Sequence, residues 1–511
     1  MTTSDRRMLA ANDKFVADKV IAKARQSSKA RPTINRAIDA IHTRSIEEQR
    51  SMTEEIGQVA IIGAGPSGVA AGKNCKQTGL DFVIFDQNSA VGGNWLFSED
   101  EGHSSVYEAS HIISSKTWSQ YEDFPMPEDY PDYPSHRQLQ RYFADYADHF
   151  GVTPHIRFRH HISHVRRRDD GLWHIDYSDA EGQAHSEVYK YLMVANGHHW
   201  APNMPEYPGM FNGRLMHSHQ FKRLDGSFRD KNVLVIGAGN SACDVAVETG
   251  RVSAKTCLST RSGQWFFPKF IMGLPGDLLV AKMRGLPVKV QQKLFKWTLL
   301  LLQGRNRNYG LPEPKSDPLA HHPTLNSELF YFIRHGRISA RPAVERFEGD
   351  NVVFVDGHRE AFDSVIAATG YRTIFPFFDR SFIDFEHARK VPLYRKMMHA
   401  DYDNLYFVGL FQPIGCIWPM SDFQARLACE EILGNYKRPA DMQAAVAHEN
   451  DNPHVAFEGG RRHAVEVDYH KFRKELAGEL RSAGVDMGKA PPDRKGFRYI
   501  APPRVEMKKS A

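Results

Sequence analysis

Two glycine-rich turns in this chain have the residue types and the spacing that bind the pyrophosphate group of a dinucleotide. The first turn follows an apolar segment at residues 59–62 and leads into a run of small residues, which predicts a strand, a turn and a helix. Glycines allow so tight a turn and let backbone N–H groups approach a pyrophosphate at the helix N-terminus. The expected cofactor contacts of this turn are Gly63, Gly65, Pro66, Ser67 and Gly68.

The second turn follows the apolar segment 233–236 and has the same order of strand, turn and helix. One turn of this kind is a weak signal. Two in one chain indicate two dinucleotides handled together, most simply a flavin and a nicotinamide. The expected cofactor contacts of the second turn are Gly237, Gly239, Asn240 and Ser241.

Side chains that follow the next strand of each unit distinguish the two nucleotides. Asp86 ends the strand after the first turn, and an acidic side chain there holds ribose hydroxyls, which indicates the adenosine end of FAD. Arg261 stands near the corresponding strand end of the second unit. Its guanidinium matches an adenosine 2′-phosphate, so NADPH is favoured over NADH. A further turn beside the predicted FAD supplies three more candidate contacts, Gly93, Asn94 and Trp95.

The composition is typical of an intracellular enzyme. The chain has 511 residues, 25% of them charged and 41% apolar, and its net charge of +5 suits anionic cofactors without indicating nucleic-acid binding. Its five cysteines show no metal-ligand spacing, so we expect reduced thiols and no metal site. There is no signal-peptide core and no apolar run near the ~20 residues of a membrane span, so we expect a cytoplasmic protein. The oligomeric state stays open, with a homodimer as one option.

The order of the predicted elements indicates an α/β fold with two Rossmann-like dinucleotide-binding domains. Strands resume after the second nucleotide unit, so we expect the NADP-binding domain to be inserted into the FAD-binding domain. The expected parts are an N-terminal helical extension (1–55), the first part of the FAD-binding domain (56–215), the NADP-binding domain (216–340) with a helical insertion (264–325), the second part of the FAD-binding domain (341–440), and a C-terminal helix and tail (441–511).

Two segments are expected to cover the active site. Residues 106–133 are too apolar for disorder and too rich in proline for a helix, which predicts an ordered loop. Residues 288–302 form an apolar run interrupted by lysines and by Trp297, which predicts a helix that caps the active-site side. Peripheral contact of this helix with a membrane is the alternative interpretation.

A third pattern lies just ahead of the second turn and consists of Phe211, Gly213, His217 and Phe221 at fixed spacing. Together with the two turns, it makes the chain similar to a flavin-containing monooxygenase of the class B flavoprotein monooxygenases. The resemblance covers about residues 56–480, so the chain looks like an atypical, N-terminally extended member. Further matching segments are 260–263, 368–371 and 412–413.

The resemblance implies how such a protein works. NADPH reduces FAD, O₂ adds at the flavin C4a carbon to give a (hydro)peroxyflavin, and a small-molecule substrate takes one oxygen atom while the other leaves as water. The resemblance also places Thr369 and Gln412 at the cofactors. It puts His217 and Phe221 at the junction between the domains, where they help to orient the nicotinamide.

One position departs from the amine-oxygenating members, which carry an asparagine near the flavin where this chain has Ile113. An isoleucine cannot form a hydrogen bond there, and His111, Ser114 and Ser115 are candidates to replace it. N- or S-oxygenation of soft nucleophiles is the leading prediction, and Baeyer–Villiger oxygenation of ketones by the same peroxyflavin is the alternative. A flavin-dependent NADPH reductase and a non-catalytic dinucleotide-binding protein are further alternatives.

Overall fold

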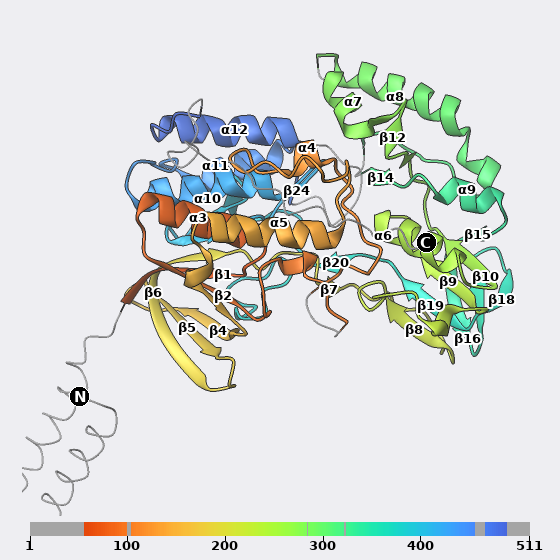
Figure 1. The fold of residues 1–511 in the computed structure, drawn as a ribbon, viewed down its shortest axis with the longest axis horizontal. Helices are drawn as coiled ribbons and strands as arrows, with labels where there is room; N and C mark the ends of the chain where they lie inside the picture. Colours follow the sequence, from red (N-terminus) through yellow and green to blue (C-terminus); the bar gives the residue numbers. More distant parts are fainter. Residues whose placement is uncertain (1–55, 100–103, 284, 321–322, 455–464, 488–511) are drawn as a thin grey trace, which may run out of the picture. The chain divides into compact units, whose positions relative to one another are not determined.

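The computed structural model of the chain describes residues 56–99, 104–283, 285–320, 323–454 and 465–487. The helical extension predicted for residues 1–55 lies outside the described residues, as does the end of the predicted tail, 488–511. The described part of the chain contains two large sheets, each packed against its own helices (Figure 1).

The first sheet has the order β21-β22-β23-β6-β1-β2-β3, and β5 and β4 extend it from β6. Strands β1 and β2 are parallel, with Val59 opposite Phe82. Their paired segments, 59–62 and 82–85, are continuous apolar runs, as expected for a sheet that is covered on both faces. The strands are β1 (Ile56–Ile62), β2 (Phe82–Asp86), β3 (Ile156–Phe158), β4 (His161–Arg167), β5 (Trp173–Ser178), β6 (Ala184–Val194), β21 (Leu393–Tyr394), β22 (Met398–His399) and β23 (Leu405–Phe407).

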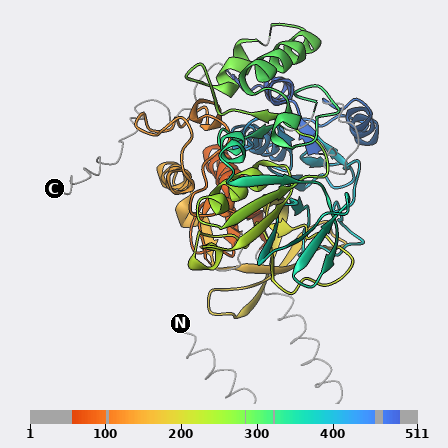
Figure 2. The same ribbon diagram turned by 90° about the vertical axis from the view of Figure 1, so that its right-hand side faces the viewer.

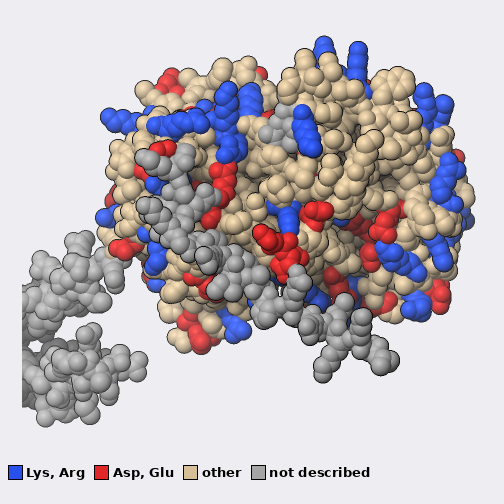
Figure 3. Space-filling model, turned by 45° about the horizontal axis from the view of Figure 1, so that its top comes forward, with Lys and Arg blue, Asp and Glu red and all other residues tan. Residues whose placement is uncertain are grey.

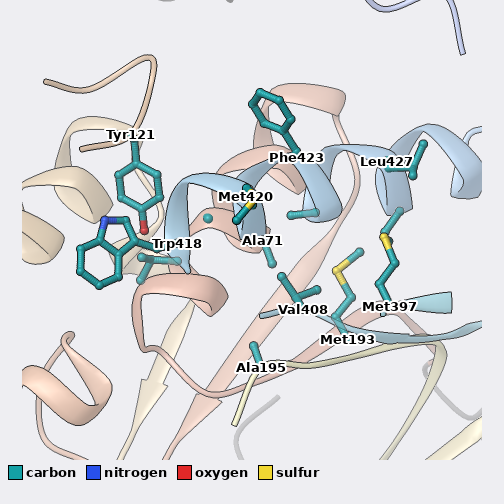
Figure 4. Packing of buried hydrophobic residues seen from close by; sticks show 14 of the residues in the cluster. Ala71, Tyr121, Met193, Ala195, Met397, Val408, Trp418, Met420, Phe423 and Leu427 are labelled. Carbon is teal, nitrogen blue, oxygen red and sulfur yellow. The ribbon is translucent and has the colours of Figure 1, made fainter. Parts of the chain in front are cut away.

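Helices α3 and α10 pack side by side against the first sheet. Figure 4 shows Phe423 and Leu427 of α10 beside Ala71 of α3, with Met193 and Val408 below them, and all five side chains are buried. Apolar residues at helical spacing make this face of α10 continuous with the core. The helices of this part are α3 (Pro66–Thr78), α4 (Lys116–Ser119), α5 (His136–His149), α10 (Trp418–Ile432), α11 (Met442–Asp451) and α12 (Tyr469–Ser482).

The second sheet has the order β15-β10-β9-β19-β8, and its strands are parallel. In Figure 2 these strands, green to teal, face the viewer. Its elements are β8 (Arg214–His217), β9 (Asn232–Ile236), α6 (Asn240–Gly250), β10 (Lys255–Ser259), α9 (Leu329–Arg334), β15 (Ile338–Arg341) and β19 (Ser364–Ala367).

The second sheet extends beyond the limits of 216–340 that we expected for the NADP-binding domain. Strand β8 begins earlier and β19 lies later, yet both pair within this sheet. A three-stranded sheet, β16 (Val344–Glu348), β17 (Asn351–Phe354) and β18 (Arg359–Ala361), shares a buried cluster with Leu234 of β9. Residues 344–367 therefore lie with the second sheet. The sequence could not show this, because a short apolar strand carries no mark of which parallel sheet it joins.

The predicted insertion forms a separate layer at the top of Figure 1. The helix predicted over residues 288–302 is present as α8 (Val288–Gln303) and is preceded by α7 (Gly276–Lys282). Within the described ranges, no helix has both the length and the apolar character needed to cross a bilayer. The short elements of the chain are η1 (Gly93–Trp95), η2 (Thr153–His155), β7 (Ala201–Pro202), η3 (Gly226–Phe228), β11 (Phe266–Phe267), β12 (Phe270–Ile271), β13 (Leu274–Pro275), η4 (Asn306–Tyr309), β14 (Thr324–Leu325), β20 (Tyr371–Arg372), β24 (Gln412–Pro413) and β25 (Glu466–Val467).

A buried ionic cluster ties three segments of the first part together. The ammonium group of Lys73 on α3 lies 2.8 Å from Asp123 of the 106–133 loop and 2.6 Å from Asp422 on α10. Burial by itself lowers the pKa of Lys73, but the two carboxylates more than offset this, so the pKa is raised and the lysine stays charged. Removing one member would leave uncompensated charge in the interior.

We predict that Lys73→Met lowers the free energy of unfolding by about 3 kcal/mol or more, because two carboxylates lose their buried counterion. Urea denaturation followed by circular dichroism measures the change. Lys390→Met is the matched control: Lys390 also forms an ion pair, with Asp451 at 2.6 Å, but both side chains are 62% exposed, so little change is expected. Equal stability of the two variants would contradict this account.

Candidate active site

The first glycine turn connects β1 to α3 and depends on glycine for steric reasons. Gly63 has a φ of +104°, and a Cβ there would lie 2.6 Å from the carbonyl oxygen of Ala195. A Cβ on Gly68 would lie 1.7 Å from the carbonyl oxygen of Gly63. The first turn of α3 has no side-chain cap and no acidic residue, so its backbone N–H groups suit an anion.

The other residues expected at the first turn gather around it. The Pro66 carbonyl accepts a hydrogen bond from the Tyr121 hydroxyl (2.7 Å), and the hydroxyl oxygens of Ser67 and Ser421 lie 2.9 Å apart. A Cβ on Gly93 would lie 2.8 Å from Cα of Gly65, so the backbone of η1 lies directly over the turn. These contacts join the 106–133 loop, η1 and α10 at one end of the first sheet.

Asn94 and Trp95, expected as cofactor contacts, also have structural partners. The Asn94 side-chain oxygen accepts a hydrogen bond from the backbone of Ser105 at 2.6 Å. The Trp95 ring meets the Trp418 ring edge-on, with centroids 5.9 Å apart. Both side chains therefore hold the loop that follows the first turn against its neighbours.

The carboxylate of Asp86 is directed at the turn itself. One oxygen accepts the N–H of Ala64 at 2.5 Å, and the other accepts the N–H of Asn88 at 2.7 Å. Burial raises the pKa of this carboxyl group, and the two N–H donors oppose that rise. Each carboxylate oxygen keeps a lone pair, so Asp86 can hold the turn and still accept a ribose hydroxyl.

The second turn repeats the design between β9 and α6. Gly237 has a φ of +141°, and a Cβ there would lie 2.4 Å from the carbonyl oxygen of Ala368. A Cβ on Gly239 would meet nothing within 4 Å, so the turn faces open space. Helix α6 has no side-chain cap and no acid in its first turn. Ser241 and Arg261 are exposed at this end of the sheet.

Asn240, expected as a cofactor contact, also has structural partners. Its side-chain oxygen accepts the backbone N–H of Leu325 at 2.7 Å, and the Thr324 hydroxyl donates to the Ala238 carbonyl at 3.1 Å. The side chain of Asn240 thus anchors the end of the insertion to the second turn.

A cluster of rings lies between the two turns. The Nε2 atom of His198 lies 3.4 Å from the side-chain oxygen of Gln412, and the His199 ring lies beside Tyr371, which in turn meets His217 edge-on at 5.3 Å. Burial lowers the pKa of His198 to about 4 and that of His217 to about 4 as well, so both are neutral at pH 7.

Nδ1 of His198 and the hydroxyl oxygen of Thr260 are buried near strand ends and lack a hydrogen-bond partner among the described residues. Buried polar atoms are rarely left unpaired. With the open face at Gly239 and the uncapped helix N-termini, they indicate that both sites are shaped for ligands that donate and accept hydrogen bonds. The Thr369 hydroxyl donates to the Asn203 carbonyl at 2.6 Å, beside the second turn.

The remaining candidate residues, Phe221, His111 and Ser114, lie in three different environments. Phe221 is 1% exposed and packs between Tyr107 and Phe228, so it belongs to the core of the second part. His111 is exposed, and its Nδ1 lies 2.9 Å from the Ala109 carbonyl. Ser114 is buried, with its hydroxyl oxygen 2.8 Å from that of Ser119. Of the three proposed replacements, His111, Ser114 and Ser115, only Ser114 lines the cavity described next.

An apolar cavity of about 900 Å³, including the solvent at its mouth, lies between the 106–133 loop, the insertion, the segment after β24 and the start of α12. Ile113 and Ser114 of the 106–133 loop line it, as do Ile414 just after β24 and Leu325 beside Asn240. No lysine or arginine is among the residues that line it. Nowhere in the described ranges do three or more His, Cys, Asp or Glu residues gather in a geometry that would hold a metal ion.

Two acidic residues that the sequence did not single out for this role join the parts around the cavity. Asp277 at the start of α7 lines the cavity and accepts the backbone N–H of Ser115 at 2.6 Å. Asp244 on α6 is half-buried and accepts bonds from the Tyr107 hydroxyl (3.0 Å) and the Asn326 amide (2.7 Å). None of these three bonds lies within a local sequence pattern, so no signal in the sequence could have revealed them.

Comparison with known proteins agrees with this geometry. Residues 56–484 match the family model described as flavin-binding monooxygenase-like. Dimethylaniline monooxygenase [N-oxide-forming] 2 of Rattus norvegicus is 32% identical over 446 residues, which cover 83% of each chain. Flavin-containing monooxygenase 5 of Oryctolagus cuniculus is 33% identical over 441 residues, 82% of each chain.

Solved structures share the fold. S-allyl-L-cysteine S-oxygenase from Allium sativum superposes with a TM-score of 0.62 at 20% identity, covering 85% of this chain and 90% of that one. Cyclohexanone monooxygenase from Rhodococcus sp. Phi1, bound to NADP⁺, gives a TM-score of 0.63 at 16% identity over 84% of this chain and 98% of that one. The chain therefore belongs to the family of flavin-binding monooxygenases, enzymes that use FAD and NADPH.

Proposed function

We propose that this monooxygenase transfers one oxygen atom of O₂ to the nitrogen or sulfur atom of a small, apolar substrate. The observation that carries the proposal is the apolar cavity enclosed by the 106–133 loop, the insertion and the segment after β24. When bound, FAD and NADPH supply the electrons and the activation of O₂. The chain supplies binding, orientation and exclusion of water.

The first turn is proposed to hold FAD. The N–H groups at the start of α3 face its pyrophosphate, and Asp86 faces its ribose. Neutral His198 has an unpartnered Nδ1 that can accept a hydrogen bond from the cofactor, while Gln412 fixes the ring from the other side. Gly93 covers the turn because its backbone lies against Gly65.

The second turn is proposed to hold NADPH. Gly239 leaves space for the pyrophosphate at the start of α6, and Arg261, exposed at the end of β10, faces the 2′-phosphate. His217 is neutral and sits next to Tyr371 between the two sites. We therefore assign it to positioning the nicotinamide rather than to proton transfer.

The lining of the cavity favours soft nucleophiles. A neutral amine or thioether needs only an apolar wall and exclusion of water, which Ile113 and Leu325 provide. Attack on a ketone places negative charge on the carbonyl oxygen, and a cation or a strong hydrogen-bond donor stabilises that charge. The lining offers a carboxylate, Asp277, and no lysine or arginine, and its side chains that can donate hydrogen bonds are Ser114, Trp118, Tyr469 and His470. The preference for soft nucleophiles therefore rests on the absence of a cationic side chain from the lining.

To test the reaction, tertiary amines, thioethers and cyclic ketones are each incubated with enzyme, NADPH and isotopically labelled O₂, and products are analysed by mass spectrometry. We expect N-oxides and sulfoxides carrying one labelled oxygen atom. Lactones from the ketones, with no N- or S-oxide, would replace this proposal with Baeyer–Villiger oxygenation. NADPH oxidation without any labelled product would contradict both reactions.

We predict that Gly65→Ala loses most of its bound FAD. Gly65 has φ −71° and ψ −179°, and its added Cβ would lie 3.5 Å from Cα of Gly93, so the backbone and its neighbours tolerate alanine and the methyl crowds only the pyrophosphate. The ratio of flavin to protein absorbance measures the loss, and the melting temperature of the flavin-free protein checks folding. Gly239→Ala is the matched control in the second turn and should keep its flavin. Full flavin content in Gly65→Ala would refute the assignment of the first turn.

We predict that Arg261→Ala raises KM for NADPH by about tenfold or more and leaves KM for NADH unchanged, because only the contact with the 2′-phosphate is lost. Steady-state oxidation of each nucleotide measures both constants. Arg359→Ala, an exposed arginine on β18 (57% exposed), serves as the control and should match the unmodified enzyme. A parallel rise in both KM values would place Arg261 outside the 2′-phosphate site.

A further inference from the structure

Helix α8 is apolar on two opposite faces. On its inner face, Phe295 and Leu299 are buried against Phe267, and Phe295 lines the cavity. On its outer face, four apolar residues recur at intervals of four, three and four residues, which places them on one stripe. These residues and their exposed fractions are Val290 (41%), Leu294 (44%), Trp297 (72%) and Leu301 (87%).

A stripe that is exposed to this degree on a helix already packed by its other face is not needed for folding. Exposed apolar patches of this kind mark surfaces that bind a partner or a membrane. Leu286 before α8 and Leu302 at its end, 41% and 51% exposed, extend the apolar surface at both ends. In Figure 3, tan atoms dominate the upper right, on the side where α7 and α8 lie in Figure 1, with separate blue side chains among them.

The charge around the stripe has one sign. From residue 278 to residue 312 the sequence contains seven Lys or Arg residues and no Asp or Glu. Lys289, Lys293 and Lys296 follow the helix at intervals of four and three residues, along one flank of the stripe, and all three are exposed. The ammonium group of Lys296 lies 2.9 Å from Asp317, which leaves the flank cationic overall.

We propose that the outer face of α8 docks on an anionic lipid bilayer, with Trp297 and Leu301 entering the boundary between headgroups and acyl chains. An apolar stripe with Trp and Leu, flanked by lysines, is the pattern of a helix that lies in the membrane interface. Anionic headgroups attract the flanking lysines at the same time. This docking goes beyond the oxygenation reaction and does not depend on its substrate class.

Other occupants fit the charge less well. A second copy of the same face would bring two cationic flanks together, and like charges across an interface oppose association. The two terminal segments outside the described residues are also basic: residues 1–55 contain 11 Lys or Arg and 8 Asp or Glu, and residues 488–511 contain 7 and 2. The bilayer is the occupant that complements both the apolar stripe and the cationic flank.

Flotation of the FAD-loaded, full-length protein with lipid vesicles tests the proposal. We expect binding to phosphatidylcholine vesicles that contain phosphatidylglycerol, weaker binding to phosphatidylcholine alone, and loss of binding as salt is raised. The double variant Trp297→Ser/Leu301→Ser should bind the anionic vesicles about tenfold less tightly or worse. Lys289→Glu/Lys293→Glu should also lose binding, but only to the anionic vesicles.

The matched control is Tyr331→Ser/Val355→Ser, which removes two apolar side chains, each 60% exposed, from outside the insertion and should bind like the unmodified protein. Flavin content and melting temperature check that every variant folds. No binding by the unmodified protein, or equal binding by the Trp297/Leu301 variant, would overturn the proposal. A dimer in light scattering that this variant dissolves, without any vesicle binding, would overturn it in favour of self-association.

Discussion

Both nucleotide turns are closed against backbone carbonyl oxygens, at distances that leave no room for a side chain. A methyl group on Gly63 would lie 2.6 Å from the carbonyl oxygen of Ala195, and one on Gly237 would lie 2.4 Å from that of Ala368. The first turn is therefore pressed against the end of β6 through Ala195, and the second against the end of β19. The remaining residues of the two sites are arranged around the ends of these two strands, β6 and β19.

Contacts between polar side chains connect the two sites at their junction. Tyr107 reaches from the 106–133 loop to Asp244 on α6, and His198, Tyr371 and His217 form a chain of rings from one turn to the other. Burial raises the pKa of Asp244 and lowers the pKa values of both histidines. Both histidines are neutral at pH 7, which suits a junction that excludes water.

The features that could be predicted from the sequence are those that a local pattern of residues determines. The two turns, the strands before them, helix α8 and the family follow from glycine spacing and apolar periodicity. Long-range assignments were not accessible: β19 joined the second sheet, and Asn240 proved to hold the insertion through its side chain. Phe221 matches the family pattern, and its side chain is buried in the core of the second part. Asp277 was missed because its partner, Ser115, lies 162 residues away.

The bond from Leu325 to Asn240 makes one residue of the cavity wall an extension of the second turn. A displacement of the turn would therefore be transmitted to the wall through this bond and through the bond from Thr324 to the Ala238 carbonyl. Thermodynamic linkage then requires reciprocity. If the bound nucleotide raises the affinity for an apolar substrate by a certain factor, the bound substrate raises the affinity for the nucleotide by the same factor. The side chain of Asn240, which the sequence pattern assigns to a cofactor, thus links the nucleotide site to the wall of the substrate cavity.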